Sequence, residues 1–331
     1  MSILFHKAHI TDEEINEVVD TLKSGWLTMG PKTIAFEKAI QDYLDVPFAV
    51  STNSATAALH LSLKAMGLKA SDEVIIPTTT FISTAEVVTY FNAIPVLCDI
   101  DEKTHCMDVT KIEPLITEKT RAIIPVHFAG IPCDMDAIMA IAKKHSLIVI
   151  EDAAHSMPSS YKGRKIGTVA DMTCFSFYAT KTLATGEGGM VTTANEVYAK
   201  HIQCNRLHGL SKDAWNRYSD KGSWYYEVVD NGYKYNMTDI AASLGLVQLK
   251  KVEWMRDERQ KIADFYDNAF ESSSIETLCV PDDVQTAWHL YVIKINNREE
   301  LMTKLKEAGI HTSVHFIPVH KHPYYKDTFG Y

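Results

Sequence analysis

Long apolar runs and paired cysteines are both missing from this sequence. No apolar stretch approaches the roughly 20 residues that a membrane-spanning helix needs. The N-terminal stretch MSILFHKAHITDEE lacks the charged and then apolar pattern of a signal peptide. The six cysteines are scattered, with no C-x-x-C pair and no spacing typical of zinc sites. We therefore expect a cytoplasmic protein with reduced thiols, no membrane partner and no metal.

Positively charged residues are also fewer than negatively charged ones. The 331 residues include 33 lysines and arginines against 42 aspartates and glutamates, for a formal net charge of −9. Neither phosphate backbones nor acidic lipids favour a net-negative surface, so we expect no nucleic-acid partner. A local basic pocket for a small phosphorylated ligand is compatible with this charge, because net charge says little about one cleft.

The glycine-rich fingerprint of nicotinamide enzymes is absent too. No G-x-G-x-x-G occurs, and the glycine cluster at residues 186–189 has a different spacing and precedes a strand. Histidines do gather near the C-terminus, but a strand and loop rich in histidine is at least as often substrate-lining or solvated as metal-binding. These histidines, for which we expect no metal, are His311, His315, His320 and His322.

What the sequence does contain is a regular alternation of short apolar runs and helical patterns. Continuous apolar strands separated by helices indicate an α/β fold with a mostly parallel sheet that is covered on both faces. The run GMVTT at residues 189–193 predicts a further strand of this sheet. The other predicted strands lie at residues 74–76, 95–98, 122–126, 147–150 and 173–177, with helices predicted at 82–91 and 135–144.

The pattern changes after about Asp239 and predicts a second, smaller unit. A few helices and strands of mixed order are typical of an α+β domain. We therefore predict a large domain over residues 1–250 and a small α+β domain over residues 251–331. The elements predicted after Asp239 are helices at 240–249, 253–270 and 298–308 and strands at 288–295 and 312–316.

Polar residues follow the predicted strands at points where a ligand would be expected. In parallel α/β sheets, ligands sit where the carboxyl ends of strands meet the N-termini of helices. One strand ends near Val50 and a helix begins near Ser54, so its free backbone N–H groups and positive dipole end suit a phosphate. Asp152 directly follows an apolar strand, where a carboxylate is costly unless it meets a positive partner. A plain helix cap and a buried aspartate that caps a loop are the ordinary alternatives.

Lys181 lies just past a buried strand and ahead of the glycine-rich turn GEGG. Desolvation and a nearby positive group lower the pKa of a lysine and make its neutral amine available for Schiff-base chemistry. A surface lysine in a loop is the ordinary alternative, but the buried flanks argue against it. Together, the lysine, the aspartate and the helix N-terminus match the aldehyde, the ring nitrogen and the phosphate of pyridoxal 5'-phosphate (PLP). We therefore predict a PLP enzyme.

Several blocks of this sequence resemble the sugar aminotransferases of the DegT/DnrJ/EryC1/StrS family, from about residue 5 to the end. They are FSFYATKTLATGEGG, EDAAHS upstream of it, GWLTMGPKTIAFEKAI, IPVHFAGIPCDMDAI and GYKYNMTDIAASLGLVQLKK. The blocks RLHGLSKDAW and EVVDNGYKYNMTDI are most similar to members that aminate C4 of UDP-linked keto sugars, of the UDP-4-amino-4-deoxy-L-arabinose transaminase type. Family members extend further past HFIPVHKHPYY, so the resemblance implies a small domain that is shortened here.

The resemblance implies a PLP-dependent transferase of fold type I that works as a homodimer with shared active sites. It implies that Lys181 forms the Schiff base with PLP and that Asp152 pairs with the pyridine nitrogen. His155 is then expected near the ring hydroxyl.

The remaining implied contacts divide between cofactor and substrate. Phe81 is expected to stack on the cofactor ring, and Asn236 is expected to reach the phosphate bound in the partner subunit. The residues expected to hold the phosphate are Thr56, Ala57 and Ser176. The residues expected to border the sugar nucleotide are Trp26, Thr28, Gly30, His315 and His320.

By this resemblance the chain is expected to move an amino group from L-glutamate, which leaves as 2-oxoglutarate, to a nucleotide-linked keto sugar. A UDP-linked 4-keto sugar for surface polysaccharide or glycoconjugate synthesis is the expected acceptor. Amination of a 3-keto sugar and a non-catalytic sensor of PLP or of a nucleotide sugar are the alternatives. PLP-dependent sugar dehydratases of the same group carry histidine in place of the lysine, so Lys181 argues against that reaction.

Overall fold

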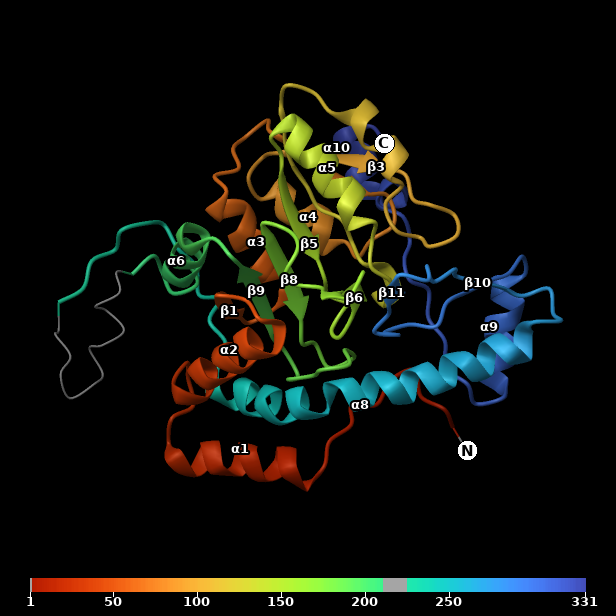
Figure 1. Cartoon of the computed structure of the whole chain (residues 1–331), viewed down its shortest axis with the longest axis horizontal. Coiled ribbons are helices and arrows are strands. Elements are labelled where there is room, and N and C mark those ends of the chain that lie inside the picture. Colours follow the sequence, from red (N-terminus) through yellow and green to blue (C-terminus); the bar gives the residue numbers. More distant parts are fainter. Residues whose placement is uncertain (1, 211–224) are drawn as a thin grey trace.

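The computed structural model describes residues 2–210 and 225–331. Its centre is a seven-stranded sheet in the order β1-β9-β8-β5-β4-β2-β3 (Figure 1). Neighbouring strands run parallel except at β9, which is antiparallel to both β1 and β8. The predicted mostly parallel α/β sheet is therefore confirmed, with residues 189–193 as one of its strands. The strands are β1 (Phe48–Thr52), β2 (Glu73–Pro77), β3 (Ile94–Cys98), β4 (Thr120–Ile123), β5 (Ile148–Asp152), β8 (Met172–Ser176) and β9 (Gly189–Thr193).

Helices cover both faces of the sheet because strand side chains alternate between two separate apolar clusters. Ile75 and Phe175 belong to the cluster shared with α2, α5 and α8. Their neighbours Ile76 and Cys174 belong to the cluster shared with α3, α4 and α6. The helices are α1 (Asp12–Ser24), α2 (Pro31–Leu44), α3 (Ala55–Ala65), α4 (Ser83–Thr89), α5 (Met135–His145), α6 (Glu196–Asn205), α8 (Asp239–Phe270), α9 (Arg298–Glu307) and α10 (Pro323–Phe329).

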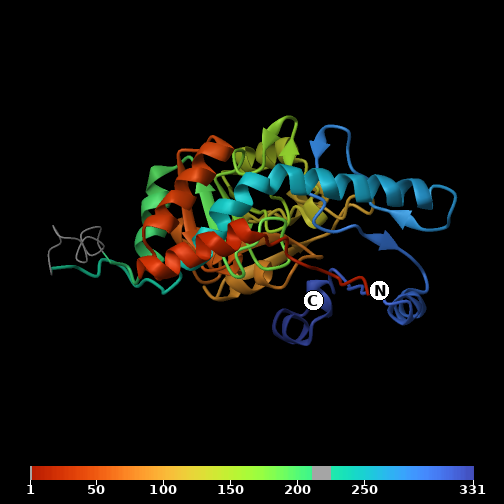
Figure 2. The same cartoon turned by 90° about the horizontal axis from the view of Figure 1, so that it is seen from below.

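α8 is a single helix of 32 residues. It packs on α1 and α2 at its start and runs on to the C-terminal elements (Figures 1 and 2). The prediction of two separate helices here was wrong. Lys250 and Lys251 are good helix formers and Val252 is fully buried, so the helix continues through the position where the apolar pattern weakens. The predicted domain boundary at residue 250 falls inside this helix, and the division into two domains stays a prediction.

The C-terminal elements contain less strand than the sequence predicts. Of the strand predicted at residues 288–295, only Ile293–Lys294 (β12) forms, paired with Glu276–Thr277 (β10). The amide of His289 instead donates to the carbonyl of Ala129, in the 3-10 helix Phe128–Gly130 that precedes α5. The start of the predicted strand is therefore used to attach the segment to the rest of the molecule.

The strand predicted at residues 312–316 is also wrong, since no strand forms there in the described structure. A strand needs a neighbour for its backbone groups. The N-terminal segment provides only an isolated bridge, between Ile3 and Ile310. The helix predicted beside it is confirmed as α9. The remaining short strands form one three-stranded sheet: β6 (Ser160–Tyr161), β7 (Arg164–Lys165) and β11 (Val284–Gln285).

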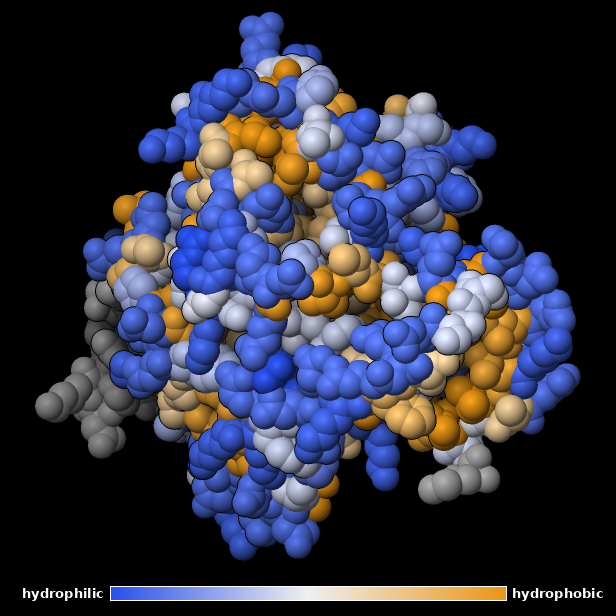
Figure 3. Space-filling view, turned by 45° about the vertical axis from the view of Figure 1, so that its right-hand side comes forward, coloured by the Kyte–Doolittle hydropathy of each residue, from blue (hydrophilic) through white to orange (hydrophobic). Residues whose placement is uncertain are grey.

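The face of the molecule in Figure 3 is mainly hydrophilic, with several separate patches of hydrophobic residues. Ile3 and Leu4, in the N-terminal segment that bridges to Ile310, are 59% and 58% exposed. Within the described ranges, no helix is both long enough and apolar enough to cross a membrane.

Asp239 begins α8 and also caps α2. Its carboxylate accepts hydrogen bonds from the amides of Gly30 (2.7 Å), Lys32 (3.0 Å) and Thr33 (2.9 Å) and from the Thr33 hydroxyl (2.6 Å). The Asp239 amide donates to the carbonyl of Thr28 at 3.1 Å. One buried carboxylate therefore satisfies the free N–H groups at the start of α2 and joins two helices that are far apart in the sequence.

Replacing Asp239 by alanine is expected to lower the free energy of unfolding by about 2–3 kcal/mol, because it removes a cap and leaves buried amides unpaired. Urea unfolding followed by circular dichroism measures this change. Asp264→Ala, which removes an exposed carboxylate from the same helix, is the matched control and should leave the midpoint nearly unchanged. Equal effects of the two substitutions would contradict the capping role.

Candidate active site

A cleft of about 360 Å³ lies at the carboxyl ends of the central strands. It brings together residues from the starts of α3 and α4, the ends of β5 and β8, and the C-terminal segment. The carboxyl edge of a parallel sheet is where ligands of α/β proteins are expected. The residues that line it are Phe5, Ser54, Ala55, Thr56, Thr80, Phe81, Ser83, Val126, Asp152, Ala154, His155, Ser176, Tyr178, Thr180, Lys181, Glu187, Gly188, His289, His315 and Phe316.

Asp152 is the last residue of β5, and its carboxylate is 96% buried at the floor of the cleft. It accepts hydrogen bonds from the Thr84 hydroxyl at 2.7 Å and from the Ala154 amide at 3.2 Å. Burial raises the pKa of Asp152, while these two hydrogen bonds and the Lys181 charge oppose the rise. A cation bound beside this carboxylate would therefore gain from a fixed, desolvated counter-charge.

Lys181 follows β8 in a tight turn, in which its amide donates to the carbonyl of Tyr178 at 2.8 Å. Burial lowers the pKa of Lys181 to about 8, against the attraction of Asp152. With this pKa, about a tenth of the amine is neutral at pH 7, roughly 300 times the fraction of an ordinary lysine. The site therefore presents an amine that is ready to act as a nucleophile or a base.

The N-terminus of α3 borders the cleft on another side. Ser54 is its N-cap, and the Ser54 hydroxyl accepts from the Ala57 amide at 3.1 Å. Thr56 and Ser176 line the cleft, whereas Ala57 is buried behind it. Helix N-termini favour anions, so this edge suits a phosphate that contacts Thr56 and Ser176. The Ala57 amide is already engaged by the cap.

Two histidines, His155 and His289, form the wall beside Lys181. Their ring centroids are 4.3 Å apart, and both are buried. Nδ1 of each ring is buried without a hydrogen-bond partner among the described residues. Burial, followed by the Lys181 charge, holds the pKa of both imidazoles well below its usual value. Both rings are therefore neutral, and an unpaired nitrogen of His155 is available to a polar ligand group.

Aromatic rings line the cleft in two contacting pairs, Phe81 with Phe316 and His315 with Phe5. Phe81 is 56% exposed, and its ring lies 5.8 Å from that of Phe316. The ring of His315 stacks on that of Phe5 at 5.5 Å. Phe81 and His315, both predicted from the sequence, therefore lie where their side chains would cover a flat ligand ring and its substituents.

Besides Ala57, five of the predicted site residues do not line this cleft. Trp26, Thr28 and Gly30 belong to the turn before α2, where the Trp26 indole donates to the Met29 carbonyl at 3.1 Å. Asn236 lies just before α8 and donates to the Met237 carbonyl at 3.2 Å. The fifth is His320, in the 3-10 helix Val319–Lys321. The end of the block RLHGLSKDAW, residues 211–215, lies outside the described residues.

Other cleft residues were missed by the sequence reasoning. Phe316 was treated only as the end of a predicted strand, and Phe5 lies near the N-terminus, outside any strand pattern. His289 interrupts the apolar run TAWHLYV, which is a usable signal, because a polar residue inside a predicted buried strand needs a partner. The histidines considered there were those from residue 311 onward.

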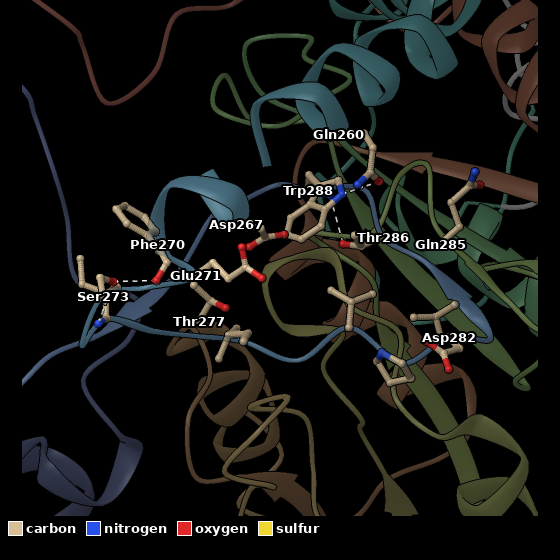
Figure 4. Close-up of a pocket in the computed structure, with 15 residues that line it drawn as sticks. Gln260, Asp267, Phe270, Glu271, Ser273, Thr277, Asp282, Gln285, Thr286 and Trp288 are labelled. Atoms are coloured by element: carbon tan, nitrogen blue, oxygen red, sulfur yellow. Dashed lines mark hydrogen bonds between the residues drawn. The ribbon is translucent and has the colours of Figure 1, made fainter. Parts of the chain in front are cut away.

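A second, more open hollow of about 780 Å³ lies between the C-terminal half of α8 and residues 273–288. Figure 4 shows the carboxylates of Asp267 and Glu271 in it, near Trp288. Its lining contains no lysine and no histidine. Although this hollow is larger, it holds neither Lys181 nor Asp152, so the chemistry places the candidate site in the smaller cleft. Within the described residues, no group of three or more His, Cys, Asp or Glu side chains is arranged to hold a metal ion.

The cleft fits PLP on its own geometry. It combines a depressed-pKa amine, a buried carboxylate with its acceptors toward the cleft, an unpaired nitrogen of His155 and the N-terminus of α3. These four features suit an aldehyde, a protonated ring nitrogen, a ring hydroxyl and a phosphate, respectively. The roles of the individual residues remain predictions.

Comparison with known proteins gives a consistent picture. The model of the DegT/DnrJ/EryC1/StrS aminotransferase family matches residues 8–331. The chain is 52% identical over 330 residues to the spore coat polysaccharide biosynthesis protein SpsC of Bacillus subtilis, covering 97% of this chain and 85% of that protein. An uncharacterised protein of Methanocaldococcus jannaschii is 55% identical over 329 residues, with the same two coverages of 97% and 85%. Spr1654 of Streptococcus pneumoniae, a candidate sugar aminotransferase solved in its PLP form, superposes with a TM-score of 0.93 at 39% identity, over 100% of this chain and 88% of that one.

Proposed function

Because this chain belongs to the DegT/DnrJ/EryC1/StrS aminotransferase family and is a PLP-dependent sugar aminotransferase, we propose that it moves an amino group from L-glutamate to a nucleotide-linked 4-keto sugar. The observation that carries the proposal is one cleft in which the Lys181 amine, the Asp152 carboxylate and the N-terminus of α3 face a common space. UDP is the proposed nucleotide, from the sequence blocks that resemble C4 aminotransferases.

The cofactor would supply the reactive groups, and the residues of the cleft would hold it in place. When bound, PLP supplies an aldehyde that takes up the amino group and a ring that accepts the electron pair left by the departing proton. Asp152 would hold the proton on the ring nitrogen of PLP, because a buried carboxylate is stabilised by a cation beside it. Thr56 and Ser176 would hold the phosphate at the start of α3, and His155 would contact the ring hydroxyl.

Lys181 performs the proton transfer. With PLP bound, the neutral amine of Lys181 would act as the base that takes a proton from the amino donor and as the acid that gives it back. The depressed pKa of Lys181 supports this role, since an ammonium ion cannot accept a proton. Lys181 would serve as base and acid in the same way when the keto sugar is the amino acceptor.

We also propose that the enzyme is a homodimer with shared sites. α1 carries a row of exposed apolar side chains, Ile15, Val19 and Leu22, at the spacing of one helix face. Trp26 and Leu27 continue this row beside the predicted substrate residues that lie outside the cleft. A second copy on this face would cover the apolar row and add those residues to a site. Light scattering during size-exclusion chromatography measures the mass, and a monomer would contradict this part of the proposal.

The biological setting follows from the relatives and the thiols. The name of SpsC supports a role in the synthesis of a surface polysaccharide. All six cysteines are free thiols, which supports the cytoplasm as the proposed location, because disulfides are rare in that compartment.

An absorbance spectrum before and after addition of L-glutamate tests the first half-reaction. The proposal predicts a long-wavelength band of lysine-bound PLP that falls as the band of the aminated cofactor rises. A panel of UDP- and dTDP-linked 4-keto and 3-keto sugars, read by mass spectrometry, then identifies the acceptor. A band that ignores glutamate would refute glutamate as the amino donor, and turnover of 3-keto sugars alone would refute the C4 assignment. Protein that binds PLP and a nucleotide sugar without any turnover would be a sensor.

The pH dependence of cofactor uptake tests the state of Lys181. Only the neutral amine attacks the aldehyde, so the uptake rate by cofactor-free protein should rise with pH and level off above the pKa of Lys181, about 8. Stopped-flow absorbance at the long-wavelength band measures this rate. A midpoint near 10.5, the ordinary value for lysine, would show that burial does not act on this amine.

A further inference from the structure

The Lys181 amine has a neighbour that the reaction outlined above does not use. Nζ of Lys181 lies 3.5 Å from Nε2 of His289, its hydrogen-bond partner within the described ranges. His289 is 8% exposed, and its other ring nitrogen, Nδ1, is buried without a partner among the described residues. A neutral imidazole carries a lone pair on one ring nitrogen, so this ring offers an acceptor to a lysine N–H.

Trp288 and His289 lie on opposite sides of one backbone segment. His289 lines the cleft, whereas Trp288 lines the second hollow beside α8. The Trp288 indole N–H donates to Gln260 Oε1 at 2.7 Å, as Figure 4 shows. Because the Trp288 side chain is hydrogen-bonded to α8, the His289 imidazole on the other side of the segment is held toward Lys181.

Main-chain contacts fix the same segment. The His289 amide donates to the carbonyl of Ala129 at 3.0 Å. The Arg259 guanidinium donates to the carbonyls of Trp288 at 3.0 Å and His289 at 3.3 Å. Trp288 has a φ of 47°, a conformation that a bulky residue rarely adopts. An unfavourable backbone conformation of this kind persists only where surrounding contacts hold it in place. Here those contacts keep the His289 imidazole directed into the cleft.

We propose that His289 is a positioning residue, which accepts a hydrogen bond from the Lys181 amine whenever that amine is released from the cofactor. This inference rests on the role of Lys181 proposed above and deepens it. The proton taken from the donor carbon then sits on Nζ, and the ammonium formed is held by Nε2 of His289 until the same proton is returned. No proton passes to the imidazole, and the lysine stays on one side of the cleft between the two transfers.

Several charged and titratable groups surround this pair and set its pH dependence. Asp152 attracts the Lys181 ammonium from the floor of the cleft. Around His289, positive charge on its neighbours disfavours a second proton on the ring, so His289 remains an acceptor over the working range of pH. These neighbours are Lys181, Arg259, His315 and His6, with His155 in ring contact.

The test uses the cofactor-free protein and cyanate, which carbamylates neutral amines. Mass spectrometry follows the modification of Lys181 against pH in the wild type, His289→Leu and His289→Gln. We expect a wild-type midpoint of about 8. Loss of the acceptor destabilises the ammonium, so the midpoint of His289→Leu should fall by about one pH unit, and the glutamine oxygen should restore most of it. His311→Gln, which removes an exposed imidazole outside the cleft, is the matched control and should keep the wild-type midpoint.

Steady-state kinetics gives an independent readout. In His289→Leu, kcat should fall about tenfold while KM for the amino donor stays near the wild-type value, because the proposed hydrogen bond is made to the Lys181 amine and not to the amino donor. An unchanged midpoint in folded His289→Leu, or a glutamine variant no better than the leucine variant, would overturn the inference. If the proposed function itself is wrong, a different result is expected: the absorbance spectrum of the wild-type protein will not change with any amino donor. The cyanate result does not depend on that outcome.

Discussion

Replacing Lys181 by alanine is expected to lower turnover by about 10⁴-fold, the upper end of what one positioned proton-transfer group contributes. The cleft contains no second lysine among its lining residues, and burial lowers the pKa of His155 and His289 and so disfavours a proton on either ring. Removal of the amine therefore removes both the attachment point of the cofactor and the carrier of the proton. Steady-state turnover with L-glutamate and the accepted keto sugar measures the loss.

Two comparisons separate this effect from a general loss of structure. Lys162→Ala removes an exposed lysine that pairs with Asp136, and it should leave turnover unchanged. Added methylamine, a small base that fits the space left by the side chain, should restore part of the activity of Lys181→Ala. Turnover of that variant within tenfold of the wild type would refute the proposed mechanism.

The parts of the site that the sequence predicts are those set by local pattern. Asp152 and Lys181 each follow a buried apolar strand, and such strands were readily recognised because both faces of the sheet are covered. Parallel strands end at the same edge, so residues that follow them meet there whatever their separation along the chain. The α3 N-terminus was found for the same reason, although its Ser54 cap engages the Ala57 amide.

The residues that the sequence reasoning missed are placed by long-range contacts. His289 reaches the cleft because Arg259 and Gln260, on α8, hold the segment around Trp288 from outside. That attachment also replaces the strand expected there. No local pattern records such an attachment, since the contacting residues are about thirty positions apart, as in the Arg259–Trp288 separation of 29.

Trp26, Thr28 and Gly30 show a different case, in which part of a predicted substrate motif also has a structural use within one chain. The Thr28 carbonyl and the Gly30 amide bond to Asp239, and this contact joins α2 to α8. A cap of this kind needs the same small and polar residues that a substrate site needs. Their proposed contact with a sugar nucleotide therefore depends on a second subunit, whereas the cap does not.

Replacing Asp152 by asparagine is expected to lower kcat by about 10²–10³-fold, the usual loss when one preorganised electrostatic group is removed. Asparagine has nearly the same shape and can still accept from Thr84 or Ala154, but it carries no charge to hold a proton on the ring nitrogen. Lys181 remains in place, so the variant should still bind PLP covalently and show the long-wavelength band. Asp282→Asn, which removes an exposed carboxylate from the second hollow, is the matched control and should act as the wild type does.

A cofactor analogue with a methyl group on its ring nitrogen makes this prediction specific. Its ring carries a fixed positive charge, so the electron pair can be accepted without any proton that Asp152 would have to hold. If the carboxylate of Asp152 acts by keeping the ring protonated, the analogue should restore much of the activity of Asp152→Asn. If Asp152 instead serves only to anchor Thr84 and Ala154, the analogue should give no gain, because those contacts do not depend on the charge of the ring.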